Sequence, residues 1–179
     1  FVEGYTDVMA AHLAGVGTAV ATCGTAFGTE HIKVLRRLLM DDDRMRGQVI
    51  FTFDGDAAGQ KAALRAFEED QKFVSQTFVA VEKSGLDPCD LRLQHGDAAV
   101  RALIDSKVPL FEFAIKSVLA QHNLNTSEGR IAALKEGAPI VSKIRDTSLR
   151  PEYARRLAGW LGMDPATVSK AVGGQNAAP

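Results

Sequence analysis

Cysteine is scarce in this sequence, which has two, Cys23 and Cys89, among its 179 residues. They lie far apart and form no Cys-x-x-Cys pair, so they cannot build a zinc site alone. They indicate a reduced, cytosolic setting rather than a disulfide framework. The sequence also lacks a signal peptide and any apolar run long enough to span a membrane. We therefore expect a cytoplasmic protein with no membrane partner.

An excess of either charge is lacking as well. The chain has 21 basic and 22 acidic residues, and its formal net charge is −1. This balance argues against nucleic-acid binding through a surface that is basic overall. A local cluster of basic residues is still compatible with it. Hydrophobic residues make up 46% of the chain, which is enough for a normal core. The chain starts at Phe1, not at Met, and we interpret it as an excised fragment of a longer protein.

The clearest local pattern is a short apolar run, 49–53, followed by Asp54, Gly55 and Asp56. Such a run predicts a strand buried on both faces, as in a parallel sheet. A helix predicted over 57–67 places the two aspartates at the carboxyl end of that strand, where open α/β sheets bind ligands. Two carboxylates at this spacing suit a hard divalent cation. An Asp-Gly turn that only caps the next helix is the alternative.

Further strands are predicted around this one, at 1–4, 18–22 and 77–81, with helices over 5–14 and from Thr29 onward. Strands that alternate with helices predict βαβ units. The fold class is therefore α/β, with a mostly parallel four-stranded sheet flanked by helices. Four apolar residues are expected to form the buried face of the first helix: Val8, Met9, Ala11 and Leu13. The acidic run 41–43 is interpreted as a solvated turn.

Acidic residues follow the ends of several predicted strands. Glu3 ends the first strand, Asp7 lies one turn into the next helix, and Asp87 follows the strand at 77–81 in a loop that Pro88 stiffens. Parallel strands bring their carboxyl ends to one edge of the sheet. We therefore expect four acidic residues to converge there: Glu3, Asp54, Asp56 and Asp87.

After residue 96 no further strand is predicted, and helical spacing continues to the end. The expected domains are 1–96, a helical bundle over 97–172 and a disordered tail over 173–179. The last two helices could form a DNA-reading helix-turn-helix, but a bundle core is the better interpretation. The apolar residues assigned to that core are Leu157, Trp160, Leu161, Met163 and Val168.

Four sequence motifs, taken in order along the chain, resemble those of a known domain family. They are Glu3-Gly4-Tyr5-Thr6-Asp7-Val8, Cys23-Gly24-Thr25, Asp54-Gly55-Asp56-Ala57-Ala58-Gly59 and Asp87-Pro88. The set resembles the Toprim domain shared by bacterial primases, topoisomerases and some nucleases. The wording of the first and third motifs is similar to the primase branch, the bacterial DnaG-type replicative primase. The resemblance covers about the first 95 residues.

The resemblance implies a template-directed RNA polymerase that makes primers on single-stranded DNA from nucleoside triphosphates during replication. It implies Mg²⁺ or Mn²⁺ as cofactor, cytoplasmic, nucleoid-associated action, and contact with a replicative helicase through a region outside this chain. Glu3, Asp54 and Asp56 would be catalytic, and these three with Asp7 and Asp87 would hold the metal. Thr25, Gly55 and Gly59 would contact nucleotide phosphates. Most of the template grip would precede Phe1, so the fragment alone is expected to be inactive or weak.

One position departs from the family pattern. The usual third motif is Asp-Pro-Asp, whereas here Cys89 stands where its second acid belongs and Asp90 follows one residue later. A thiol is a poor magnesium ligand. Either the loop presents Asp90 instead, or one outer metal position is weaker.

Three other functions compete with primer synthesis. A phosphatase of the haloacid-dehalogenase type also ends a buried strand in Asp-x-Asp, but it leaves Glu3 and Gly4 without a role. A Toprim nuclease or topoisomerase shares the acids, although neither Tyr5 nor Tyr153 has the context of a topoisomerase nucleophile. The fragment could also be only a module that binds metal and nucleotide.

Overall fold

The computed structural model describes residues 1–24, 29–39, 47–54, 76–144 and 146–174. The chain divides into two compact units, Phe1–Leu110 and Phe111–Pro179, and each has a hydrophobic core of its own. None of the helices in the described ranges has both the length and the apolar character that crossing a bilayer requires. The predicted helix over 57–67 and the predicted turn at 41–43 lie outside the described residues.

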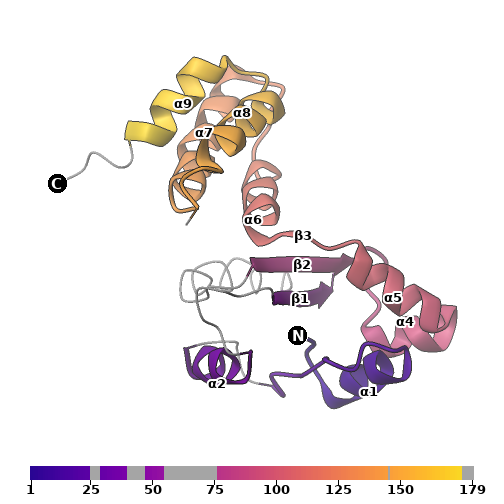
Figure 1. The fold of residues 1–179 in the computed structure, drawn as a ribbon. Coiled ribbons are helices and arrows are strands. Elements are labelled where there is room, and N and C mark those ends of the chain that lie inside the picture. The colour runs from indigo at the N-terminus through magenta and orange to yellow at the C-terminus, as the bar shows by residue number, and fades with distance from the viewer. Residues whose placement is uncertain (25–28, 40–46, 55–75, 145, 175–179) are drawn as a thin grey trace. The chain divides into compact units, whose positions relative to one another are not determined.

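The first unit is built on a small mixed sheet with the strand order β1-β2-β3 (Figure 1). Strand β1 (Gln48–Asp54) pairs in parallel with β2 (Gln76–Glu82), in a register that sets Asp54 opposite Glu82. The strand expected from the apolar sequence is confirmed, and Val49 and Phe51 on one face are 3% and 2% exposed, whereas Ile50 on the other face is only partly buried. Strand β3 (Val108–Pro109) runs antiparallel to β2. The prediction of no strand after residue 96 was wrong here, because two residues that include a proline carry no strand pattern.

The two N-terminal strands of the prediction appear as shorter extended segments joined by backbone hydrogen bonds. Val2 forms an isolated parallel bridge with Ala21. On its other side this segment meets β1, where the Thr52 N–H donates to the Phe1 carbonyl at 2.8 Å. The Phe1 and Phe51 rings stack with their centroids 5.3 Å apart. The four predicted segments therefore lie side by side in parallel, with β3 added beyond β2.

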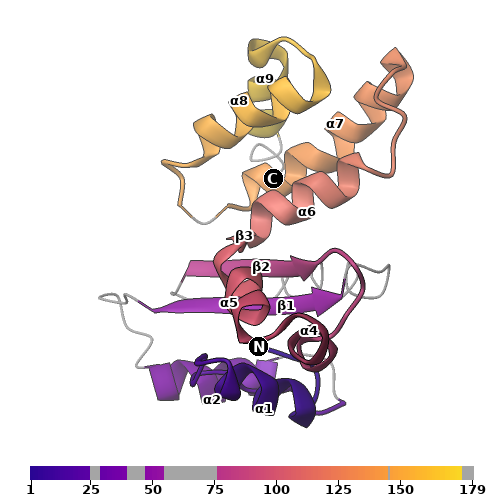
Figure 2. The ribbon, with the colours of Figure 1, turned by 90° about the vertical axis from the view of Figure 1, so that its right-hand side faces the viewer.

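Helices surround this sheet within the first unit. They are α1 (Tyr5–Leu13), α2 (Thr29–Leu39), α4 (Pro88–His95) and α5 (Asp97–Asp105). Figure 2 shows α5 lying across the strands, and its Val100 and Leu103 pack with Ala80 of β2 in one core cluster. Because α5 also contacts α1 and α4, the first unit extends to Leu110 rather than to the predicted boundary at residue 96.

Helix α1 buries only part of the predicted face, since Ala11 is buried as predicted but Met9 and Leu13 are exposed. Met9 and Leu13 are each 63% exposed, whereas Ala10 and Ala11 are 4% and 3% exposed. The helix contacts both α4 and α5. Alanines on a buried face permit a neighbouring element to approach closely, because their side chains are small. Apolar spacing alone assigns the large residues to the core, and so it misplaced Met9 and Leu13.

The second unit is helical, as predicted for the C-terminal part of the chain (Figure 2). Its helices are α6 (Leu110–Leu119), which starts at the last residue of the first unit, α7 (Ser127–Ser142), α8 (Arg150–Leu161) and α9 (Pro165–Gly174). Leu157 and Val168 are fully buried, and Trp160 and Met163 pack against the same cluster, which confirms the bundle-core interpretation. Helix α9 continues to Gly174, and the rest of the predicted tail lies outside the described residues.

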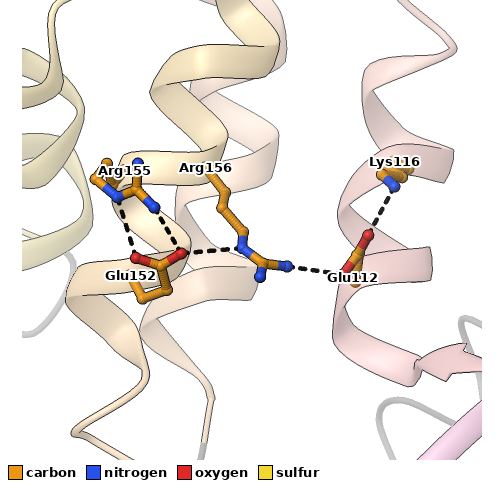
Figure 3. A network of polar contacts seen from close by, with 5 residues as sticks. All are labelled: Glu112, Lys116, Glu152, Arg155 and Arg156. Carbon is orange, nitrogen blue, oxygen red and sulfur yellow. Dashed lines mark hydrogen bonds and ion pairs between the residues drawn. The ribbon is translucent and has the colours of Figure 1, made fainter.

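Charged side chains join α6 to α8 at the edge of this core (Figure 3). Glu112 accepts from Lys116 at 2.6 Å and from Arg156 at 3.1 Å, and Arg156 also donates to Glu152. Beside this network, Phe111 meets Tyr153 edge-on, with ring centroids 4.4 Å apart. Glu112 is only 14% exposed, so solvent screens its pairs less than those of an open surface carboxylate.

Candidate metal centre

Glu3 and Asp54 lie at the same edge of the sheet. The Thr52 N–H donates to the Phe1 carbonyl and the Phe1 amino group donates to the Ile50 carbonyl, a parallel pattern that sets Phe1 opposite Phe51. Continuing this register by two residues brings Glu3 level with Phe53, one position before Asp54. Glu3 is exposed there. The sheet thus places Glu3 and Asp54, two of the predicted catalytic acids, at the carboxyl ends of two neighbouring parallel segments.

Asp87 begins a helix that the sequence interpretation had assigned to a loop. It is the N-cap of α4, and its Oδ1 accepts from the Asp90 N–H at 2.6 Å, while Pro88 occupies the first turn. An aspartate followed by proline is a standard helix start. The same pair of residue types, Asp164-Pro165, stands at the start of α9 (Pro165–Gly174), so the sequence signal for α4 was present. The structure therefore holds Asp87 at the N-terminus of a helix.

Cys89 occupies the second position of α4. Partial burial raises the pKa of its thiol, and the nearby carboxylates of Asp87, Asp7 and Asp90 raise it further. A thiol that keeps its proton offers little to Mg²⁺, which prefers charged oxygen ligands. Asp90 is exposed in the same helical turn, with its backbone N–H bonded to Asp87. What Cys89 contributes is its backbone, because its N–H donates to Oδ1 of Asp7 at 3.3 Å.

Asp7 is buried, at 5% exposure, in the first turn of α1. Its Oδ2 accepts from the Gly4 N–H at 3.0 Å. Burial raises the pKa of Asp7, with the charge of Asp87 adding to the effect, while the hydrogen bonds from Gly4 and Cys89 oppose it. Asp7 thus belongs to the same neighbourhood as Asp87, but it lies beneath the surface.

Glu82 is an acid at this edge that the sequence interpretation missed. It ends β2 opposite Asp54, and its Oε2 accepts from the Ser84 N–H at 2.7 Å and the Leu86 N–H at 3.0 Å. Burial alone would raise the pKa of Glu82, but these hydrogen bonds outweigh it and lower the pKa. Its position at the end of a predicted strand was the available signal. Its role in the structure is to close the turn that leads to α4.

The Cys23-Gly24 turn closes over the first motif. The Cys23 N–H donates to the Glu3 carbonyl at 3.2 Å, and both turn residues have positive φ, 54° at Cys23 and 77° at Gly24. A hydrogen bond with Cys23 raises the pKa of Tyr5. The second motif is therefore tied to the backbone of the Glu3 segment.

The structure thus brings Glu3, Asp7 and Asp87 into one region of the first unit. Asp54 ends β1, the strand next to the segment that carries Glu3. Among the residues whose side chains are described, no three His, Cys, Asp or Glu groups are close enough together to hold a metal ion. The donors in this region are carboxylates, the oxygen ligands that suit a hard cation such as Mg²⁺ or Mn²⁺. Four predicted positions lie outside the described residues: Thr25, Gly55, Asp56 and Gly59.

Comparison with known families agrees with this arrangement. A model of the Toprim domain matches residues 1–80. A second model, the DnaB-helicase binding domain of primase, matches residues 111–166, which is most of the helical second unit. The fold and the acidic edge therefore define a Toprim protein. The second match lies within this chain, whereas the sequence interpretation placed the helicase-contacting region outside it.

The curated relatives are DNA primases. The protein from Streptomyces coelicolor is 62% identical over 162 residues, covering 90% of this chain and 25% of the relative. The one from Mycolicibacterium smegmatis is 60% identical over 163 residues, covering 91% of this chain and 26% of the relative. The chain belongs to the DnaG-type DNA primase family, and it spans about a quarter of the length of these relatives.

A solved structure gives the same result for the fold. The RNA polymerase domain of Mycobacterium tuberculosis primase DnaG, in complex with a double-stranded DNA oligomer that has a 6-nucleotide overhang, is 60% identical to this chain. It superposes with a TM-score of 0.76 over 91% of this chain and 51% of that one. The chain thus corresponds to about half of that polymerase domain.

Proposed function

We propose that this chain carries the metal-binding part of a DNA primase, an enzyme of the cytoplasm that joins nucleoside triphosphates into an RNA primer on single-stranded DNA. The observation that carries the proposal is the placing of Glu3, Asp54 and Asp87 after neighbouring parallel segments in a Toprim chain. Oxygen ligands grouped at that edge suit nucleotidyl transfer, which depends on positioning and charge stabilisation.

In this proposal Glu3, Asp54, Asp56 and Asp87 hold Mg²⁺ or Mn²⁺. When bound there, a divalent cation would supply charge stabilisation for nucleotidyl transfer, and the carboxylates would hold it in place. Because neighbouring carboxylates raise one another's pKa, we expect weak metal binding by the protein alone and firmer binding with nucleotide. Thr25, Gly55 and Gly59 are the proposed phosphate contacts.

Template binding draws on more than this chain. Its net charge is −1, so it has no overall attraction for DNA, and it matches only about half of the mycobacterial polymerase domain that was crystallised with DNA. We expect residues 1–179 alone to bind manganese and nucleoside triphosphate but to prime poorly. Robust primer synthesis by this chain alone would contradict that expectation.

Calorimetric titration with Mn²⁺, with and without nucleotide, tests the metal assignment. We expect Asp54→Ala and Asp56→Ala each to weaken Mn²⁺ binding by roughly tenfold or more, because each removes a ligand. Asp105→Ala, an exposed carboxylate on α5 of the same unit, is the matched control and should leave the affinity unchanged. Unchanged affinity in both Asp54→Ala and Asp56→Ala would exclude this metal site.

We further propose that the helical second unit binds a replicative helicase of the DnaB type. The support is the family match over residues 111–166, which falls within the unit that begins at Phe111. Leu157→Asp places a charge at a position that is 0% exposed, so it should unfold this unit and abolish binding of a fluorescently labelled DnaB-type helicase. Val100→Asp disrupts the core of the first unit instead and should leave helicase binding intact. The opposite pattern would place the helicase contact on the first unit.

A further inference from the structure

Asp7 differs from the other acids of the candidate metal centre in its burial. Among the residues whose side chains are described, it is the only buried carboxylate, at 5% exposure. Glu3 and Asp90 are exposed, and Asp87 is partly exposed at the start of α4. A buried carboxylate is costly unless hydrogen bonds compensate for its lost hydration. The partners of Asp7 therefore indicate what it does.

Both oxygens of Asp7 accept backbone hydrogen bonds, and they come from two different helices. Oδ2 accepts from the N–H of Gly4, the N-cap of α1, at 3.0 Å. Oδ1 accepts from the N–H of Cys89, in the first turn of α4, at 3.3 Å. Both amides are among the N–H groups that a helix start leaves without an intrahelical partner. One carboxylate thus joins the N-termini of α1 and α4, which lie 82 residues apart at this contact.

Each of these two amides is close in sequence to a proposed metal ligand. Gly4 directly follows Glu3, and Cys89 is two residues after Asp87. Asp87 is itself fixed to α4 by its N-cap hydrogen bond to Asp90. Any displacement of α4 along α1 therefore changes the separation of Glu3 and Asp87. The two hydrogen bonds of Asp7 oppose such a displacement.

The same geometry argues against Asp7 as a metal ligand. Mg²⁺ binds at a short distance, demands near-ideal octahedral geometry and usually keeps several waters. A carboxylate that is 5% exposed, with both oxygens engaged by amides, leaves little room for a hydrated ion. We infer that Asp7 is a positioning residue: it holds the N-termini of α1 and α4 together, and so sets the spacing of Glu3 and Asp87, without ligating the metal. This inference rests on the proposed primase function.

Amide hydrogen exchange on the metal-free chain of residues 1–179 tests the bridge. In Asp7→Asn the amide group accepts only one hydrogen bond in this geometry and turns an N–H toward the other donor. We expect exchange to accelerate by about tenfold or more at the amide that the asparagine oxygen no longer reaches, either Cys89 or Gly4, because that N–H loses a hydrogen bond to a charged acceptor. The buried Val79 amide in β2 should keep its protection, which separates a local release of α4 from general unfolding.

Asp90→Asn is the matched control for this measurement. It alters an exposed carboxylate in the same helical turn and leaves both Asp7 hydrogen bonds in place, so the Cys89 amide should exchange at the wild-type rate. Unchanged exchange rates at both Cys89 and Gly4 in Asp7→Asn would overturn the inference. Equal acceleration at Cys89 and Val79 would also overturn it, since Asp7 would then support the whole unit.

Thiophilic-metal rescue separates positioning from ligation. Primer synthesis is measured in a complete primase carrying Glu3→Cys or Asp7→Cys, with Mg²⁺ and then with Mn²⁺ plus Cd²⁺, which thiolates bind better. We expect the softer ions to restore activity to Glu3→Cys and not to Asp7→Cys. Rescue of Asp7→Cys would make Asp7 a ligand and overturn its positioning role. If Glu3→Cys is not rescued, the proposed role of Glu3 as a metal ligand fails, and the exchange measurement alone decides the role of Asp7.

Discussion

Replacing Glu3 with glutamine should reduce primer synthesis by roughly 100-fold or more in a complete primase that carries this segment. A metal ion contributes several kcal/mol of transition-state stabilisation, and about 1.4 kcal/mol corresponds to a factor of ten in rate. Glutamine keeps the size of the side chain but removes the charge that a hard cation requires. The quantity to measure is the initial rate of primer formation at saturating nucleotide.

The fold should survive this change, because Glu3 is exposed and what ties its segment to the sheet is backbone hydrogen bonding. We expect the free energy of unfolding to change by no more than about 0.5 kcal/mol. Glu30→Gln, on the exposed surface of α2, is the control for loss of one carboxylate and should retain full activity. Retained activity in Glu3→Gln would remove Glu3 from the catalytic set.

The edge of the sheet was predictable because parallel strands obey a simple rule. The end of β1 was predictable because a buried strand must stop where charged residues begin, and acids directly follow its apolar run. Neighbouring parallel segments then bring Glu3 to the same edge. The placing of these acids follows from topology, so it needed no knowledge of side-chain packing.

The environment of each acid was not predictable in the same way. Asp7 and Asp87 are both acidic residues near strand ends, yet one is buried beneath two helix starts and the other caps a helix. The contact between the Asp7 carboxylate and the Cys89 amide joins residues 82 positions apart. Only the docking of α1 against α4 creates it, and the buried residues of α1 include small alanines that carry no strong sequence pattern. Long-range packing therefore decided which acids are accessible.

In the second unit, Gly129 lies close against the backbone of a neighbouring loop, and this contact leads to a prediction about stability. In Gly129→Ala, the added Cβ would lie 2.0 Å from the Asn123 carbonyl oxygen, far inside van der Waals contact. That carbonyl accepts from both the N–H and the hydroxyl of Thr126, the N-cap of α7. The loop must move and loosen these bonds, so we expect Gly129→Ala to lower the free energy of unfolding of the second unit by about 3 kcal/mol.

The only tryptophan of the sequence, Trp160, lies in this unit, so its fluorescence during urea unfolding reports on the second unit alone. Gly159→Ala is the matched control, because it makes the same substitution in α8 with nothing within 4 Å of the added carbon. There alanine should stabilise the helix by about 0.5–1 kcal/mol. The two variants thus differ in sign for the same chemical change, because only Gly129 lies against a fixed carbonyl. Equal effects at both sites would show that the approach of Asn123 to α7 does not limit the packing of this bundle.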